Sequence, residues 1–319
     1  MRLTIHGFNM RKIILIIIIT MLSFSSLMSQ SCTIFTLKSD TEVYFGSNED
    51  YLLDNTFITF KPGNETTYGT AILGFHNNNF WGDNYPQGGY NTEGLTFDAN
   101  SLPSVLLNNH SRDRIQNPEG YALENILQNC KNVSEVIHWF QTHDFNMPTI
   151  AGQFQFADAN GNATVISVYN GDWVFTSIQK ANYMVSTNYN LANISNGEYP
   201  CWRYNNAILL LQQIDTKNIT EESLVAVLKS THLEGQTHTV YSYLVNVKTL
   251  DIALFYEHDF TTKKVFNLQT ELNQGEHTFD LGQLFYQSRK TNNIEGFGVM
   301  TMNICLVSIF GLNKIRRKN

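Results

Sequence analysis

The sequence predicts an α+β domain in which β-sheets stack on one another and helices cover the outside. Short runs of alternating or β-branched apolar residues come first, and two stretches with helical spacing follow. More strands, two more helices and a last pair of strands complete the chain. The dipeptides Asn160-Gly161 and Asn170-Gly171 separate apolar runs and are typical of antiparallel hairpins. This order of elements favours sheets and helices packed as layers.

The first strands are expected to form a hairpin. Residues 32–37 and 42–47 carry alternating or β-branched apolar side chains around the turn Lys38-Ser39-Asp40. Further strands are predicted over residues 57–60, 70–75 and 95–98. Because residues 59–92 are rich in glycine, asparagine and aromatic side chains, we expect long loops there, where substrate pockets are often built.

The rest of the chain alternates between helices and strands. Apolar residues at helical spacing predict helices over 121–128 and 133–142, with Asn132 or Ser134 as a cap. Strands are predicted over residues 154–156, 164–169, 173–177 and 182–188. Pro200 is expected to open a helix that runs to about Ile214. A helix from Thr220 to Thr231 and a hairpin over 240–247 and 252–257 follow.

Composition narrows the class of protein. The 319 residues include 21 Phe, 15 Tyr and 4 Trp, so a large core is available. The net charge of −7 and the lack of a long basic run argue against nucleic acid as a partner. Four cysteines are too few for a disulfide-stapled scaffold, and pairing of Cys130 with Cys201 is left open.

The N-terminus has the layout of an export signal. Arg2, Arg11 and Lys12 precede an apolar run, and small residues stand before Cys32 where cleavage is expected. We therefore expect residues 1–31 to be a signal peptide and Cys32 to begin the mature chain. An N-terminal cysteine carries a thiol and a free α-amine, and the amine can activate the thiol as a nucleophile. Acylation of Cys32 as in a lipoprotein, and an ordinary buried or disulfide-bonded cysteine, are the alternatives.

The sequence of the C-terminus predicts a segment that inserts into the membrane or directs sorting. Residues 296–312 are largely apolar and uncharged, and Lys314, Arg316, Arg317 and Lys318 follow at once. A short apolar run with a basic end is typical of a membrane anchor whose end is cytoplasmic, and it also resembles the sorting tails of some surface proteins. We expect a domain over 32–291 and a transmembrane or sorting tail over 292–319. A buried C-terminal helix is the alternative.

Six short blocks contain residue types that are suited to catalysis, and they follow one another in a particular order along the chain. They are Cys32-Thr33, Gly46-Ser47-Asn48-Glu49-Asp50, Asn91-Thr92-Glu93-Gly94-Leu95, Asp98-Ala99-Asn100, Ser186-Thr187-Asn188 and Trp202-Arg203-Tyr204. Together they resemble the linear-amide hydrolases of the N-terminal nucleophile class, which include choloylglycine (bile salt) hydrolases, penicillin V acylases and relatives of acid ceramidase. The resemblance covers the chain from Cys32 to about Phe260 and implies an αββα sandwich.

The resemblance also implies roles for single residues. Cys32 sulfur attacks the amide carbonyl, and its α-amine carries a proton to the leaving nitrogen. Asp50 matches the residue that holds the α-amine, and Asn188 matches a donor to the oxyanion. Arg203 matches the arginine near the thiol, where positive charge favours thiolate. Asn100 is the best candidate for a second oxyanion contributor, with Asn91 as the alternative.

The chain departs from bile salt hydrolases at one position. Those enzymes carry arginine before the asparagine of the second block, where this chain has Ser47, which argues against bile salts as substrates. The histidines form no His-x-x-x-His pair and the cysteines no Cys-x-x-Cys, so we expect neither a metal nor a cofactor.

The expected protein is therefore an exported cysteine amidase, tethered to the membrane by its C-terminus, that cleaves a small N-acyl amide. A surface-anchored, non-catalytic binding protein on a hydrolase fold and a lipoprotein acylated at Cys32 are the rivals. The acyl group, the amine and the oligomeric state stay open.

Overall fold

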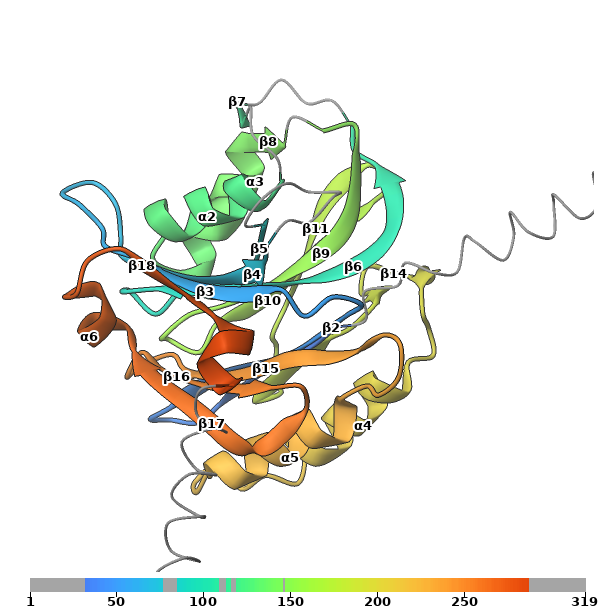
Figure 1. The fold of residues 1–319 in the computed structure, drawn as a ribbon. Coiled ribbons are helices and arrows are strands. Elements are labelled where there is room, and N and C mark those ends of the chain that lie inside the picture. The colour runs from blue at the N-terminus through green and yellow to red at the C-terminus, as the bar shows by residue number, and fades with distance from the viewer. Residues whose placement is uncertain (1–31, 77–84, 109–112, 116–118, 146, 287–319) are drawn as a thin grey trace, which may run out of the picture.

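Two antiparallel β-sheets form the body of the protein (Figure 1). The computed structural model describes residues 32–76, 85–108, 113–115, 119–145 and 147–286. The first sheet has six strands in the order β12 (Tyr183–Ser186), β1 (Thr33–Lys38), β2 (Val43–Tyr51), β15 (His238–Asn246), β16 (Asp251–Tyr256) and β17 (Asp259–Asn267). The second has eight, in the order β11 (Asp172–Ser177), β10 (Ala163–Tyr169), β9 (Thr149–Ala157), β6 (Thr96–Leu106), β5 (Tyr85–Asn91), β4 (Thr70–Phe75), β3 (Thr56–Lys61) and β18 (His277–Asp280).

Helices cover the outer faces of both sheets, so the protein has four layers (Figure 1). Helices α2 (Glu119–Asn129) and α3 (Val133–Thr142) lie on the second sheet, and α4 (Trp202–Leu211) and α5 (Glu221–Thr231) lie on the first. Smaller elements are α6 (Leu268–Leu272) and the strand pairs β13 (Tyr189–Asn190) with β14 (Asn193–Gly197) and β7 (Asp113–Ile115) with β8 (His143–Phe145). The expected layered α+β architecture is confirmed.

Each pair of neighbouring layers encloses its own apolar core. Phe45, Phe60 and Tyr243 belong to the core between the two sheets. A second core lies between α2, α3 and the second sheet, and includes Phe140 and Phe154. The third core lies between α4, α5 and the first sheet. Because side chains alternate along a strand, β1 presents apolar side chains to both faces and is buried on both, whereas the buried second half of β2, Ser47 to Asp50, is polar.

The β1–β2 hairpin confirms the first predicted element. Its register pairs Thr33 with Asn48 and Phe35 with Gly46. Gly46 lets the Phe35 ring cross its strand, because a Cβ on Gly46 would lie 2.5 Å from Phe35 Cζ. The hairpin places the Cys32 block beside the Gly46–Asp50 block, which the sequence separates.

Helix α5 is fixed to β2 by the buried side chain of Asn48. Asn48 Nδ2 donates to Leu228 O at 2.9 Å and to Thr231 Oγ1 at 3.0 Å. On the neighbouring strand, Ser242 Oγ donates to Asn48 Oδ1 at 2.7 Å. The helix itself begins with a capping box between Thr220 and Ser223. Asn48 therefore has a structural task, although it stands inside a candidate catalytic block.

Three expectations are corrected. Residues 59–92 hold the predicted strand β4 and also a strand that was not predicted, β5, where long loops were expected, while residues 77–84 lie outside the described part. Helix α4 begins at Trp202 with Cys201 as its N-cap, two residues after Pro200. The late hairpin gains a third strand, β17. A fourth expectation is confirmed: of the two predicted caps for α3, Asn132 is the one used, and it accepts from Glu135 N at 3.0 Å.

Cys130 and Cys201 are both free and buried, so no disulfide joins them. The expected signal peptide and the apolar tail at 296–312 lie outside the described residues. In the part of the chain that the structure describes, no helix combines the length and the apolar character needed to cross a membrane.

Adding a methyl group at Gly46 should destabilise the protein. Gly46→Ala would force the ring of Phe35 and the side chain of Leu244, both buried, to move. We expect a loss of about 1–3 kcal/mol in the free energy of unfolding, measured by urea titration. Gly152→Ala is the matched control, because its methyl approaches only Asn100 O at 3.1 Å and the Phe154 ring at 3.9 Å. An equal loss in both variants would contradict this account.

Candidate active site

Cys32 lies immediately before β1, at the end of an interior strand of the first sheet. Only 2% of its surface is exposed. Strand β1 has β12 on one side and β2 on the other, and Ile34 packs into the core between the sheets. Since side chains alternate along a strand, Cys32 and Ile34 share this inter-sheet face. The sulfur is therefore held at one end of the layer between the two sheets.

Two buried carboxyl groups lie beside the sulfur. Cys32 Sγ donates to Glu49 Oε2 at 3.2 Å, and Ser47 Oγ donates to Glu49 Oε1 at 2.6 Å. A hydrogen bond joins the Glu49 carboxyl to that of Asp98 on β6, in the second sheet. The hydroxyl of Tyr243 donates to Asp98 Oδ2. These groups thus connect the two sheets next to the sulfur.

The surroundings of these groups favour their protonated forms. Burial raises the pKa of Asp98 to about 7. Burial and the charge of Asp98 raise the pKa of Glu49 well above its usual value. Because a hydrogen bond between two carboxyl groups needs a proton, the pair holds one proton in common. Burial, and then the charge of Glu49, raise the pKa of the Cys32 thiol, so the sulfur rests as a neutral thiol.

Asp50 lies next to Glu49 but on the opposite face of β2. The hydroxyl of Thr239 donates to Asp50 Oδ1, and Arg203 Nη1 lies 3.8 Å from Asp50 Oδ2. Within the described residues, Oδ2 has no hydrogen-bond donor, although it is buried. Burial raises the pKa of Asp50 to about 8 against the opposing effect of Arg203. The backbone N–H of Asp50 also donates to Cys32 sulfur and lowers the pKa of the thiol.

Arg203 reaches the site from the first turn of α4 and is 2% exposed. Its Nη1 donates to Cys32 O at 2.9 Å and to Thr33 Oγ1 at 3.2 Å. Its Nη2 donates to Asn188 Oδ1 at 3.0 Å and to Glu198 Oε2 at 3.1 Å. The guanidinium therefore holds the main chain at Cys32 and the side chain of Asn188 in fixed positions.

Two asparagine amides complete the arrangement. Asn100, on β6, donates from Nδ2 to Cys32 O at 3.3 Å, and its buried Oδ1 has no partner among the described residues. Asn188 follows β12 and donates from Nδ2 to Ser101 O at 2.9 Å. The structure thus brings together Cys32 and all four of its sequence-predicted partners.

Asn91, the alternative to Asn100, has a different task. Its Nδ2 donates to Leu127 O at 2.7 Å and to Cys130 O at 2.8 Å, at the end of α2. Its Oδ1 accepts from the backbone N–H groups of Glu93 and Leu95. Asn91 therefore joins the β5–β6 turn to α2, and its amide is engaged away from Cys32.

Sequence reasoning did not assign a role to Glu49 or Asp98, although both stand inside the quoted blocks. Alternation along β2 could have indicated that Glu49 is buried. Glu49 lies on the same face of the strand as Phe45 and Ser47, and this face points into the core. No comparable signal exists for Asp98, since only the docking of the two sheets brings it to Glu49.

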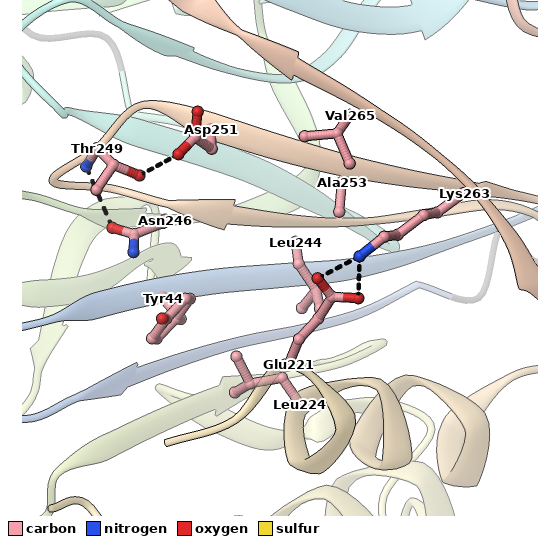
Figure 2. Close-up of a pocket in the computed structure, with 10 residues that line it drawn as sticks. All are labelled: Tyr44, Glu221, Leu224, Leu244, Asn246, Thr249, Asp251, Ala253, Lys263 and Val265. Atoms are coloured by element: carbon pink, nitrogen blue, oxygen red, sulfur yellow. Dashed lines mark hydrogen bonds and ion pairs between the residues drawn. The ribbon is translucent and has the colours of Figure 1, made fainter. Parts of the chain in front are cut away.

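A cavity of about 340 Å³ lies elsewhere, on the helix-covered face of the first sheet (Figure 2). Its apolar lining includes Leu224, Leu244 and Ala253, and Lys263 reaches from β17 to Glu221 with two contacts of 2.6 Å. Cys32 sulfur meets Glu49 on the opposite, inter-sheet face, so this cavity is not part of the candidate active site. The described residues also contain no group of three or more His, Cys, Asp or Glu placed to hold a metal ion.

Comparison with known proteins identifies the fold. No protein-family model and no curated protein sequence matches the chain. Among solved structures, a variant of conjugated bile acid hydrolase from Clostridium perfringens is similar with a TM-score of 0.62 and 16% identity, over 78% of this chain and 96% of that one. Penicillin V acylase from Agrobacterium tumefaciens has a TM-score of 0.54 and 13% identity, over 74% and 85% of the two chains.

A Caenorhabditis elegans ortholog of N-acylethanolamine-hydrolyzing acid amidase is also similar, with a TM-score of 0.51 and 19% identity over 68% of this chain and 93% of that one. The three proteins are linear-amide hydrolases of the N-terminal nucleophile class. The chain therefore has the fold of this class, as the resemblance of its sequence blocks implied.

The buried carboxyl pair should make the protein less stable as the pH rises. The folded pKa of Asp98 is about 7, whereas an unfolded aspartate titrates near about 3.9. Between these values the folded state binds more protons, so stability falls with rising pH. We expect the Tm of the wild type to fall between about pH 5 and about pH 8, and to fall less in Asp98→Asn. Glu124→Gln should keep the wild-type slope. A slope in Asp98→Asn as steep as that of the wild type would refute this assignment.

Proposed function

We propose that the protein is an exported cysteine amidase that hydrolyses a linear, non-peptide N-acyl amide through Cys32. The observation that carries the proposal is the meeting of four polar side chains at Cys32: Asp50, Asn100, Asn188 and Arg203. They come from both sheets and from α4. The names of the structural neighbours, a bile acid hydrolase, a penicillin acylase and an amidase, support amide hydrolysis as the reaction.

In the proposed reaction, removal of residues 1–31 gives Cys32 a free α-amine. The sulfur attacks the amide carbonyl, the C–N bond breaks, and the α-amine carries a proton to the leaving nitrogen. Water then hydrolyses the thioester. Asp50 Oδ2 is a buried acceptor without a hydrogen-bond donor in the described part of the chain, and it would accept from the α-ammonium.

Asn188 and Asn100 are proposed as donors to the oxyanion. Each places an amide group within one or two hydrogen bonds of Cys32, Asn100 directly and Asn188 through Arg203. One positioned donor of this kind contributes about 10²–10³ in rate. Arg203 contacts the main chain of Cys32 rather than its sulfur, so we propose that it positions the cysteine and Asn188.

The proposed substrate is a small N-acyl amide other than a conjugated bile acid. Ser47 stands where bile salt hydrolases carry arginine, and here its hydroxyl donates to Glu49. The position next to the sulfur is therefore acidic rather than basic, which disfavours substrates with anionic groups near the scissile bond. A panel of N-acyl amides that differ in acyl chain and in charge would identify the substrate.

We also propose export and a tether. The basic start and apolar run of residues 1–31, and the uncharged run 296–312 with four basic residues after it, support this localisation. The rivals are a non-catalytic binding protein and a lipoprotein. The mass of the mature N-terminus identifies the lipoprotein, which would carry a diacylglyceryl adduct on Cys32. A free Cys32 amine fits both the enzyme and the binding protein, and an activity assay then separates these two.

Removing the thiol should abolish hydrolysis. Cys32→Ala is expected to be inactive, and Cys32→Ser to lose most activity because a hydroxyl is a much weaker nucleophile at neutral pH. Turnover of an amide found in the panel is the measurement, with circular dichroism to confirm folding. Near wild-type turnover by Cys32→Ala would end the nucleophile assignment.

Keeping one residue before Cys32 should also abolish hydrolysis. The extra residue converts the α-amine to an amide, which can neither hold nor deliver the proton. Turnover of a protein that retains Ser31, with its terminus verified by mass spectrometry, tests this expectation. Full activity in that form would contradict the role of the α-amine even if Cys32 proved essential.

A further inference from the structure

We propose that Glu49 is a catalytic residue that accepts the thiol proton of Cys32 during attack, with Asp98 as its hydrogen-bonded partner. This inference rests on the proposed amidase reaction. It adds a proton acceptor on the sulfur side of the nucleophile, separate from the α-amine and Asp50. The proposal stands on the contact between Cys32 Sγ and Glu49 Oε2 at 3.2 Å.

The geometry fits a proton acceptor better than a packing residue. Glu49 is fully buried, and its Oε1 is fixed by the hydroxyl of Ser47 at 2.6 Å. This leaves Oε2 aimed at the sulfur. A carboxyl group buried beside a nucleophile carries a large desolvation cost, so a position chosen only for packing would favour an apolar side chain.

The groups around Glu49 keep it poised to take a proton. It is faced by Cys32 from β1, by Asp98 from β6 and by Tyr241 and Tyr243 from β15, all neutral or negative. Tyr243 donates to Asp98, while the buried hydroxyl of Tyr241 has no partner among the described residues. Repulsion and burial therefore favour adding a proton to the carboxyl pair over leaving it charged.

The proton balance closes over one reaction cycle. At rest the pair of Glu49 and Asp98 holds one proton, Cys32 is a thiol, and the α-amine is an ammonium next to Asp50. During attack the S–H proton moves to the pair while the S–C bond forms and the carbonyl pair of electrons moves to oxygen. The ammonium then gives its proton to the leaving nitrogen as the C–N bond breaks, so the pair holds two protons in the thioester state.

Hydrolysis of the thioester restores the resting state. Water adds to the thioester carbonyl and gives its proton to the α-amine, which becomes an ammonium again. The C–S bond breaks, and the departing sulfur takes back the proton from Glu49. The α-amine thus remains necessary, because it protonates the leaving group. Glu49 accepts the thiol proton, so the α-amine does not have to do both.

The test separates proton transfer from structural support. In Glu49→Gln, kcat should fall by about 10²–10⁴, the usual contribution of general acid–base catalysis. The thiol should at the same time ionise at lower pH, because the Coulombic effect of Glu49, which raises the pKa of the thiol, is removed. Thiol ionisation is measured without substrate, by the ultraviolet absorbance of the thiolate during a pH titration, with Cys32→Ala subtracted. The full chain in its processed form, with the Cys32 terminus verified by mass, is the material.

Two further variants guard the interpretation. Asp98→Asn keeps Glu49 but removes the neighbouring charge that, after burial, raises the pKa of Glu49, so the acid limb of the kcat/KM profile should move to lower pH. Glu124→Gln, in an ion pair with Lys61 on the outside of the second sheet, should change neither measurement. Circular dichroism and Tm verify that each variant folds.

The outcomes are distinct. A fall in kcat together with easier thiol ionisation supports the proposal. Unchanged or increased kcat in Glu49→Gln overturns it, as does a thiol that ionises no more easily while kcat falls, since that pattern shows structural support only. Loss of activity in Cys32→Ala with full activity in Glu49→Gln would leave the amidase proposal standing and refute this inference alone.

Discussion

The candidate site depends on one buried cation. Arg203 places a guanidinium in a layer that excludes water, and such a charge is tolerated only when its donors find acceptors. Its partners are the carbonyl of Cys32, the hydroxyl of Thr33, the amide of Asn188 and the carboxylate of Glu198. Asp50 lies within ion-pair distance of the same group. The segments that carry these partners are far apart in the sequence, and their contacts with the guanidinium fix their positions relative to one another.

Strand β2 divides the charges of the site between two faces. Asp50 and Arg203 lie toward the helix layer, whereas Ser47, Glu49 and Asp98 lie between the sheets. Cys32 stands at the boundary: its main chain is held by Arg203, and its sulfur contacts Glu49. The positive charge therefore acts on the position of the cysteine, and the negative charges act on the protonation of its thiol. The pKa of the thiol is raised although an arginine lies nearby, because the thiol is buried and because Glu49, Asp50 and Asp98 place negative charge around it.

Local signals account for the parts of the fold that were predicted correctly. The β1–β2 hairpin follows from alternation around a short turn, and α3 and α5 follow from their capping residues. Strand β5 was missed because Pro86, Gly88 and Gly89 have no strand propensity. The glycine at 89 is required by packing, since a Cβ there would lie 2.5 Å from Ala71 O.

The site shows the same division between local and long-range information. Cys32, Asp50, Asn188 and Arg203 stand in recognisable blocks, and the structure brings them together. Glu49 and Asp98 were not recognised, because an acidic residue in a strand is ordinarily taken for a surface residue. Only the docking of one sheet on the other reveals that these two carboxyls meet. The choice between Asn100 and Asn91 likewise needed the partners of each amide, which no local pattern contains.

The bridge from Tyr243 through Asp98 to Glu49 has a further consequence. The thiol belongs to one sheet and Asp98 to the other, so the distance between the sheets sets the distance between the reacting groups. A hydrogen bond needs its donor and acceptor within a narrow range of distance and angle, whereas apolar packing is the sum of many individually small contacts. The chemistry is therefore a more sensitive gauge of how the two sheets are docked than the overall stability of the fold. Substitutions deep in the inter-sheet core, remote from Cys32, can be read through the ionisation of its thiol.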